Sequence, residues 1–107
     1  MKIYISIPIT GHSLNDVKKE AKRIAGVLQK RYKAQAVTPF DIVSSRPEYM
    51  TEQEFYAHCM GLDIEELLLC DTIYMSYGWQ HSKGCRAEHA LAEIYGIQII
   101  THEHVKI

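Results

Sequence analysis

The segment KIYISIPITG, residues 2–11, is the starting point for interpreting this chain. Its run of β-branched and aromatic residues predicts a strand from Lys2 to Ile7 that ends at Pro8. Residues 9–13 then form a turn-rich loop, and a helical pattern follows that loop. The segment is therefore the first part of a strand–loop–helix unit.

The helix after this loop has the strongest periodic signal in the chain. Ser13 and Asp16 resemble a capping box at its start, and apolar residues at spacings of three and four form one stripe, opposite lysine and arginine. The stripe consists of Val17, Ala21, Ile24, Ala25 and Leu28. This pattern predicts an amphipathic helix.

Further strands and helices alternate along the rest of the chain. We expect strands at Ala34–Thr38, Asp71–Tyr77 and Ile97–Thr101, and helices from Thr51 to Cys70 and from Cys85 to Tyr95. Thr51 and Glu54 form a second capping pattern, and Gly96 stands where a C′ glycine ends a helix. The connection Pro39–Met50 is predicted to be a long loop.

This alternation predicts the fold class. Strands joined by helices of about ten or more residues run parallel, with right-handed crossovers. We expect an α/β fold with a small open parallel sheet of four strands flanked by three helices, similar to flavodoxin and Rossmann folds, as one domain over residues 1–107. Ligands of such sheets bind beyond the carboxyl ends of the strands, so a site is expected in the loops after the first three strands.

Composition excludes several classes of function. The chain has 12 Lys and Arg against 13 Asp and Glu, a formal net charge of −1, which argues against bulk nucleic acid as a partner. No apolar stretch reaches the roughly eighteen residues of a membrane span, and the N-terminus lacks a signal-peptide pattern, so we expect a cytoplasmic protein without a membrane partner. Three cysteines without C-x-x-C spacing indicate reduced thiols.

Two acidic residues stand out as candidates for chemistry. Glu88 lies about one turn into the last predicted helix, on a largely uncharged stripe, where its carboxylate can project back toward the preceding loop. The alternative for Glu88 is an exposed charge near the helix N-terminus. Asp63 shares a predicted covered face with Phe55 and Leu67, so it needs either a buried hydrogen-bond partner or a role in the site. Asp71 is interpreted as a turn or cap residue.

Other loop residues could contact a ligand. The run from Ser82 through Gly84 to Cys85 enters a helix with a hydroxyl and free N–H groups, which suits a single phosphate or simply caps the helix. Aromatic rings could stack on a base, and loop imidazoles could carry protons or bind phosphate. The aromatic candidates are Trp79, Tyr77, Phe40, Tyr49 and Tyr4, and for Tyr4 and Phe40 the alternative is packing in the core. The imidazole candidates are His12 and His81, and their alternative is a solvated side chain without a role.

Metal binding is the remaining possibility. His81, Cys85 and His89 recur every four residues, but His81 precedes the expected helix and a structural zinc site wants a fourth ligand. We therefore expect no metal.

The motifs taken together resemble those of the nucleoside 2-deoxyribosyltransferase superfamily. The three stretches that carry the likeness are Tyr4–Gly11, YISIPITG; Asp63-x7-Asp71; and Ser82-x-Gly84-x3-Glu88 with the following Ala90 and Ala92. The likeness spans nearly the whole chain and is closest to a short, uncharacterised branch. The last motif is also similar to that of the 2′-deoxynucleoside 5′-phosphate N-hydrolases.

The resemblance implies cleavage or transfer at the N-glycosidic bond of a nucleoside or its 5′-monophosphate, with no metal or cofactor. It implies that Glu88 is the nucleophile, that Asp63 protonates the leaving base or holds a sugar hydroxyl, and that Tyr4 orients Glu88. The resemblance assigns the 5′-phosphate or 5′-hydroxyl to Ser82 and Gly84. Together with the loop candidates, of which His12 takes no role from the resemblance, the predicted substrate-binding positions are Pro8, Thr10, Gly11, His12, Phe40, Trp79, Ser82 and Gly84. Superfamily members assemble as oligomers, so a homo-oligomer with sites near the subunit interface is expected.

One position departs from the family pattern. Ile7 occupies a place where the family commonly has glycine, and its bulk favours an alternative function, a nucleotide-binding module on the same fold without turnover. A third possibility is a glycohydrolase of a nicotinamide dinucleotide, which also uses a glutamate on a related sheet.

Overall fold

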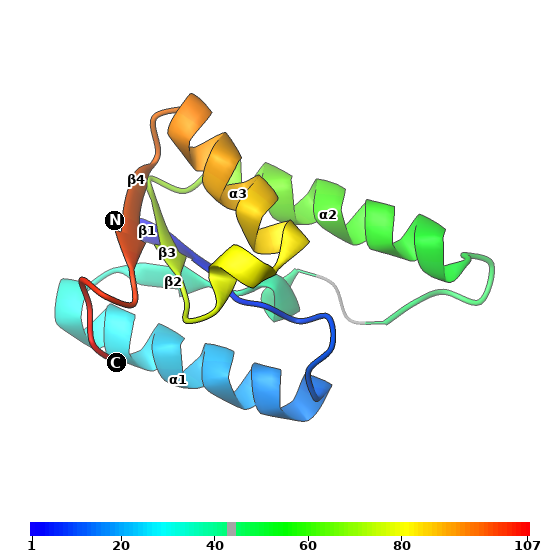
Figure 1. Cartoon of the computed structure of the whole chain (residues 1–107), viewed down its shortest axis with the longest axis horizontal. Coiled ribbons are helices and arrows are strands. Elements are labelled where there is room, and N and C mark those ends of the chain that lie inside the picture. The colour runs from blue at the N-terminus through cyan, green and yellow to red at the C-terminus, as the bar shows by residue number, and fades with distance from the viewer. Residues whose placement is uncertain (43–44) are drawn as a thin grey trace.

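A parallel β-sheet with helices on both faces forms the protein, as Figure 1 shows for the computed structural model, which describes residues 1–42 and 45–107. The strands are β1 (Lys2–Ser6), β2 (Gln35–Val37), β3 (Thr72–Met75) and β4 (Gln98–Thr101). The helices are α1 (Leu14–Tyr32), α2 (Glu52–Leu68) and α3 (Lys83–Ile94), with short 3₁₀ turns η1 (Pro39–Asp41) and η2 (Trp79–His81). The predicted fold class is confirmed, and the predicted elements differ from the observed ones only at their ends.

The strand order decides where a ligand can bind. All pairings are parallel and the order is β2-β1-β3-β4, so the chain winds outward from β1 to β2 and then returns to the other side of β1. The winding therefore reverses between β1 and β3. Their carboxyl ends lie side by side, because Ser6 pairs with Met75. This edge is the topological switch point at which open α/β sheets bind ligands.

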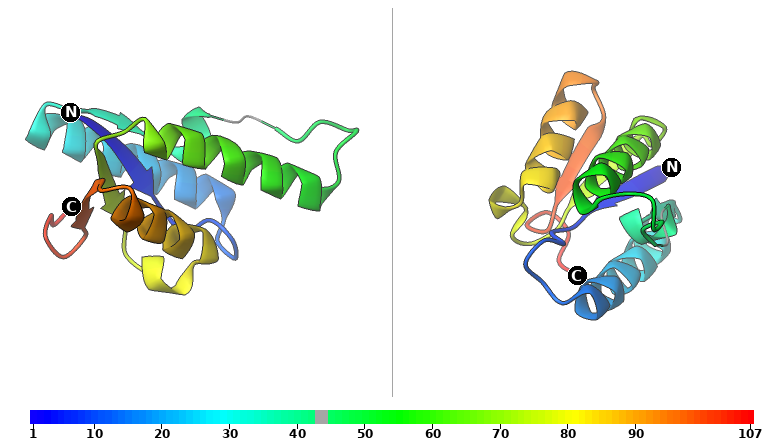
Figure 2. Two further views of the ribbon diagram at one scale, coloured as in Figure 1. Left: turned by 90° about the horizontal axis from the view of Figure 1, so that it is seen from above. Right: turned by 90° about the vertical axis from the view of Figure 1, so that its right-hand side faces the viewer.

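Residues of β1 alternate between two buried layers. Ile3 and Ile5 face α1 and pack with Tyr74, while Tyr4 faces α2 and α3 and packs with Ile73 and Met75. Helix α1 covers one face of the sheet and α2 with α3 cover the other, as the two views of Figure 2 show. Because both faces are covered, the central strands are apolar on both sides, as is usual for parallel sheets.

Two of the three predicted helix-end signals are confirmed. At the start of α2 the Glu54 N–H donates to Thr51 Oγ1 at 3.1 Å and the Thr51 N–H donates to Glu54 Oε1 at 2.9 Å. Gly96 follows α3 with φ +71°, the left-handed conformation that glycine adopts at a C′ position. The capping box predicted for Ser13 and Asp16 is wrong. Within the described residues the Ser13 side chain makes no cap hydrogen bond, and both side chains instead line a cleft described below.

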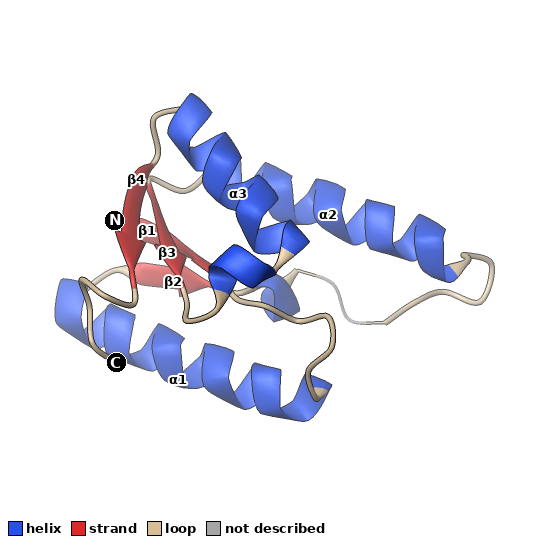
Figure 3. Ribbon diagram, in the orientation of Figure 1, coloured by secondary structure: helices blue, strands red, loops and turns tan. Residues whose placement is uncertain are grey.

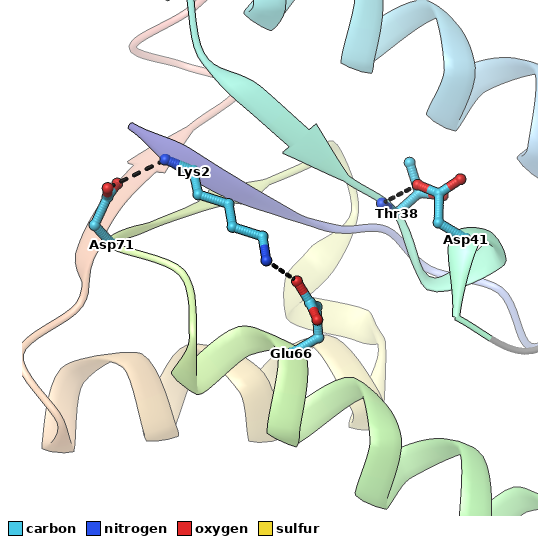
Figure 4. Close-up of polar contacts among 5 residues, drawn as sticks. All are labelled: Lys2, Thr38, Asp41, Glu66 and Asp71. Carbon is cyan, nitrogen blue, oxygen red and sulfur yellow. Dashed lines mark hydrogen bonds and ion pairs between the residues drawn. The ribbon is translucent and has the colours of Figure 1, made fainter.

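The loop predicted from Pro39 to Met50 begins with η1, and residues 43 and 44 of this loop lie outside the described residues. A capping box closes the turn, because the Thr38 N–H donates to Asp41 Oδ2 at 2.8 Å (Figure 4). This turn sets Phe40 beside the carboxyl end of β1.

Lys2 joins three parts of the fold at the opposite edge of the sheet. Its Nζ lies 2.5 Å from Glu66 Oε1 on α2, and its backbone N–H donates to Asp71 Oδ2 at 3.1 Å (Figure 4). Asp71 also accepts a hydrogen bond from Thr72 Oγ1 at 2.9 Å. These bonds hold the pKa of Asp71 below its usual value. Asp71 is thus a turn residue that anchors the start of β3, as predicted.

After β4 the chain returns along the α1 side of the sheet, where the C-terminal loop ends near α1 (Figure 3). Val105 of this loop is buried in the α1-side core. In the described part of the chain no helix combines the length and apolar character needed to cross a membrane.

Candidate active site

The carboxylate of Glu88 lies at the topological switch point and accepts hydrogen bonds from two side chains of β1. Glu88 is 5% exposed, although it lies on a helix near the cleft edge. Tyr4 Oη donates to Glu88 Oε2 at 2.6 Å, and Ser6 Oγ donates to Glu88 Oε1 at 2.8 Å. Tyr4 and Ser6 are two residues apart on a strand, so both side chains point to the same face. Each carboxylate oxygen is therefore held by its own hydroxyl.

Two opposing effects act on the proton affinity of Glu88. Burial raises its pKa and is the larger effect, while the hydrogen bonds from Tyr4 and Ser6 lower it. The pKa of Tyr4 is raised by burial and by the charge of Glu88, so the phenol keeps its proton and remains a donor. The site therefore holds a carboxylate whose orientation is set by two neutral donors.

Asp63 of α2 is the second acid of the site. It is 9% exposed, and its pKa is raised to about 7 by burial and, secondarily, by the charge of Glu88. At neutral pH this carboxyl group is therefore populated in both its protonated and its charged form. A group with that property can donate a proton, which is what an acid–base site requires.

Asp63 and Glu88 both line one cleft, which we call the Glu88 cleft. It has a volume of about 730 Å³, within the range of small-molecule sites. Its walls come from the loop after β1, α1, η1, α2 and the start of α3, and include Thr10, Phe40, Cys59, Ser82 and Gly84. Two cations also line it, Lys18 and Arg46.

The start of α3 forms one end of the cleft. Ser82 is the N-cap, and its Oγ accepts a hydrogen bond from the Cys85 N–H at 3.3 Å. Gly84 lies opposite Met60, whose Sδ would be 3.8 Å from an added Cβ. The positive end of the α3 dipole therefore opens on the cleft, a favourable place for an anionic group.

The structure brings most, but not all, of the predicted site residues together. Glu88, Asp63, Thr10, Phe40, Ser82 and Gly84 line the Glu88 cleft, and Tyr4 lies directly behind Glu88. Pro8 and His12 line a second cleft instead. Gly11 and Trp79 lie outside both clefts as the described residues form them. The Trp79 ring stacks on His89, with centroids 4.4 Å apart and planes at 16°.

Sequence reasoning missed Ser6 and the two cations. The sequence did contain a signal for Ser6. Strand alternation places Ser6 on the same face as Tyr4, and Tyr4 was already expected to contact Glu88. Lys18 and Arg46 come from α1 and from the loop before α2, and only the fold brings them to the same cleft. Arg46 Nη1 donates to the Met50 carbonyl at 2.9 Å, and Lys18 Nζ lies 5.8 Å from the centre of the Phe40 ring.

Two of the three residues considered for a metal, Cys85 and His89, have other contacts. Cys85 is buried and makes contact with Ser82, and His89 Nδ1 lies 3.1 Å from Glu93 Oε1. Over residues 1–42 and 45–107, no three His, Cys, Asp or Glu side chains gather closely enough to hold a metal ion. Cys59, Cys70 and Cys85 are free thiols.

A family model described as "Domain of unknown function (DUF4406)" matches residues 1–101, so the chain belongs to this family. A search of curated proteins finds no match. The family assignment thus defines a class of protein without naming an activity.

Solved structures with the same fold include enzymes that act on nucleosides and nucleotides. A 2-deoxyribosyltransferase from the psychrotolerant bacterium Bacillus psychrosaccharolyticus superposes with a TM-score of 0.70 at 16% identity, over 94% of this chain and 71% of that one. A conserved protein from Enterococcus faecalis V583 gives 0.68 at 19% identity, over 94% and 61%. The CMP N-glycosidase BcmB of Clostridium botulinum gives 0.57 at 17% identity, over 94% and 70%. At these identities the likeness shows a shared fold, which confirms the predicted resemblance at that level.

Proposed function

We propose that the protein cleaves or transfers at the N-glycosidic bond of a nucleoside or deoxynucleoside, or of its 5′-monophosphate, with Glu88 as the nucleophile. The observation that carries this proposal is the Glu88 carboxylate, buried at the switch point with one hydroxyl on each oxygen. The shared fold with a 2-deoxyribosyltransferase and a CMP N-glycosidase supports the substrate class.

The proposed reaction follows the chemistry of retaining glycosidases. A Glu88 oxygen attacks the anomeric carbon as the bond to the base breaks, and the transition state is oxocarbenium-like. The bonding electrons leave with the base, and Asp63 supplies the proton that the base takes up. Its pKa of about 7 suits this role, because the protonated form is present at neutral pH. Water or a second base then attacks the anomeric carbon and breaks its bond to the Glu88 oxygen, and the Asp63 carboxylate takes the proton of the attacking group, which gives hydrolysis or transfer.

Tyr4 and Ser6 act as positioning residues in this scheme. Their hydrogen bonds of 2.6 and 2.8 Å fix the plane of the Glu88 carboxylate. One carboxylate oxygen therefore faces the sugar without a further loss of side-chain rotational entropy. Ser82 and Gly84 at the start of α3 are proposed to receive the 5′-phosphate or 5′-hydroxyl, and Phe40 to contact the base or sugar. Thr10 lines the same cleft and is a further proposed substrate contact, whereas Pro8, Gly11, His12 and Trp79 are proposed to contact only those parts of a substrate that extend beyond the Glu88 cleft.

The test is release of free base. The protein is incubated with a panel of nucleosides, deoxynucleosides and their 5′-monophosphates, and the products are separated by chromatography. Glu88→Gln is expected to lower the rate by about a thousandfold or more, because it removes the nucleophile. Glu93→Gln is the matched control, since Glu93 lies on the same helix but is exposed and bonded to His89. It should leave the rate unchanged.

The outcomes separate the alternatives. Equal rates for the Glu88→Gln and wild-type proteins would refute the proposed nucleophile. The binding module is favoured by Ile7, which stands in the cleft wall where a smaller residue would leave more room. If the protein is such a binding module, a nucleotide should raise its melting temperature without any release of base. Release of nicotinamide from a dinucleotide would instead indicate the glycohydrolase.

We also propose a homo-oligomer with sites near the subunit interface. Leu14 and Tyr56 line the Glu88 cleft, yet they are 50% and 54% exposed, so the rim of the cleft carries open apolar surface. A second subunit over this rim would exclude water from the intermediate, which transfer requires. Sedimentation at several protein concentrations checks the association, and a monomer at all of them would contradict it.

A further inference from the structure

A second cleft lies on the α1 side of the sheet, away from Glu88. It has a volume of about 780 Å³ and is bounded by the loop after β1, the first half of α1, the residues after β3, η2 and the C-terminal loop. Among the described residues, Ile7 alone lines both this cleft and the Glu88 cleft. We call it the α1 cleft, and the proposed function makes no use of most of its residues.

Ser76 is the most unusual group in the α1 cleft. It is 4% exposed, and in residues 1–42 and 45–107 its Oγ is the one buried side-chain polar atom without a hydrogen-bond partner. A buried hydroxyl left unpaired is costly, and each such group in a native protein calls for an explanation.

Strand alternation directs this hydroxyl into the α1 cleft. The Ser76 N–H donates to the Ser6 carbonyl at 3.1 Å, which continues the parallel ladder beyond the last residue of β3. Met75 packs on the α2 and α3 side, whereas Tyr74 packs on the α1 side. Since side chains alternate along a strand, Ser76 points to the same side as Tyr74, and both residues line the cleft.

Other hydrogen-bond donors line the α1 cleft together with Ser76. His102 follows β4 directly alongside, because its N–H donates to the Met75 carbonyl at 3.0 Å, and its ring meets Tyr77 edge-on at 5.4 Å. Lys106 and His81 line the same cleft. The cleft therefore offers a hydroxyl, imidazoles and an ammonium group, which together suit an oxyanion.

The start of α1 forms the facing wall. Ser13 is the N-cap, but in the described structure its side chain makes no cap hydrogen bond with the helix, and Ser13 lines the cleft together with His12. The wrong capping-box prediction thus has a structural meaning, because the serine hydroxyl is left available to another partner.

Acidic residues also face the α1 cleft and restrict the ligand. Glu20 is paired with Arg23, whose Nε lies 3.0 Å from Glu20 Oε1, so its charge is largely compensated. Asp16 on the first turn of α1 would oppose an anion placed next to it, but would accept a hydrogen bond from a hydroxyl or amino group. The cleft therefore suits a molecule with an oxyanion at one end and a polar donor at the other.

We propose that the α1 cleft is a second binding site, for a small molecule that carries a phosphate or carboxylate group together with a hydroxyl or amino donor. The oxyanion is held by Ser76, His102 and Lys106, and the donor lies toward Asp16. This site is independent of the reaction at Glu88.

The test is an NMR titration of backbone amides of the full chain with named probes. The probes are inorganic phosphate, acetate and phosphoethanolamine, with sodium chloride at matched ionic strength as the salt control. We expect saturable shifts at Ser13, Ser76 and His102 for the preferred anion. A stronger response to phosphate or to acetate identifies the oxyanion, and tighter binding of phosphoethanolamine than of phosphate supports the donor position near Asp16.

Variants make the test specific. Ser76→Ala and Lys106→Ala should each weaken binding by about fivefold to tenfold, the effect of losing one hydrogen bond to a charged group. Glu88→Gln and Lys30→Ala, which alter the other cleft and the far end of α1, should bind as the wild type does. Shifts that chloride reproduces, shifts confined to Ser82 and Gly84, or unchanged affinity in a folded Ser76→Ala protein would each overturn the proposal.

Discussion

Among single residues, Asp63 and Glu88 show how burial changes what a carboxyl group does. Both are acidic side chains on helices, where solvent exposure is usual. The fold buries both beside one cleft, and burial is the main cause that raises the pKa of each. Glu88 is compensated by two hydroxyl donors, whereas the raised pKa of Asp63 brings its titration to about pH 7. The two acids therefore suit different roles.

The titration of Asp63 predicts a pH dependence of stability. Because the folded-state pKa is raised to about 7, the protonated group favours folding fully below the ordinary aspartate pKa of about 4, and this contribution is lost as the pH rises through 7. Asp63→Asn removes the loss, so its free energy of unfolding should rise relative to wild type between pH 5 and pH 8. Urea denaturation at both values measures this. Glu65→Gln, an exposed change on the same helix, is the control, and an equal difference at both pH values would contradict the assignment.

A second prediction concerns the Tyr4 hydroxyl. Tyr4→Phe removes its bond to Glu88 Oε2 and leaves a buried carboxylate with one donor fewer, so the protein should lose about 1–3 kcal/mol of stability while Glu88 is charged. The pKa of Glu88 should rise further, because one of the bonds that lowers it is gone. Urea denaturation and a carboxyl NMR titration check the two effects. Tyr74→Phe, a buried tyrosine on the opposite face, should show no coupling to Glu88.

At the scale of the elements, helix ends show where a capping pattern in the sequence forms its hydrogen bonds and where it does not. Thr51 with Glu54 and Ser13 with Asp16 have similar patterns, yet only the first pair forms a box among the described residues. Both helix starts are exposed and both line a cleft, so their surroundings do not distinguish them. The third helical residue does, because the capping-box pattern calls for Glu or Gln there, and Asp16 is one methylene shorter than Glu54.

This difference predicts that matched substitutions at the two helix starts lower stability by unequal amounts. Thr51→Ala should cost about 1 kcal/mol and speed amide exchange in the first turn of α2, because the Glu54 N–H loses its acceptor. Ser13→Ala at the start of α1 should change stability by much less, since the hydroxyl makes no cap bond in the described structure. Equilibrium unfolding and hydrogen exchange measure both. Equal losses for the two variants would show that Ser13 caps its helix in solution.

At the scale of the whole molecule, the sheet separates two apolar layers that share its strands. Ile5 belongs to the layer under α1, and Met75 belongs to the layer under α2 and α3. Lys2 adds a polar link, because it contacts Glu66 on α2 and Asp71 before β3 (Figure 4). Because each central strand packs against both layers, unfolding of one layer disrupts the strands on which the other layer packs, so the two layers should unfold together.

We therefore expect one cooperative unfolding transition, as the proposed single domain requires. Ile5→Ala and Met75→Ala should each lower stability by about 2–5 kcal/mol, because both side chains are fully buried. Each variant should move the same transition whether it is followed by circular dichroism or by Trp79 fluorescence. Two separate midpoints, each sensitive to one substitution, would show that the layers unfold independently.

The amino-acid sequence by itself determined the order of elements and the parallel sheet, and it singled out Glu88 and Asp63 as candidate site residues. These features rest on local signals, namely the periodicity of apolar residues, the turn residues and an acid placed on a face that should be covered. Signals of this kind act over a few residues, so they can be recognised without knowing the rest of the fold.

Only the tertiary structure decided which residues share a cleft. Pro8 and Thr10 are two positions apart, yet they line different clefts, because Ile7 and the loop after β1 form the wall between them. Lys18 and Arg46 reach the Glu88 cleft from distant segments, and Ser76 with His102 reaches the other. Contacts of this kind depend on the strand order and on which face of the sheet each side chain points to. Both are properties of the packed sheet and not of any short stretch of sequence.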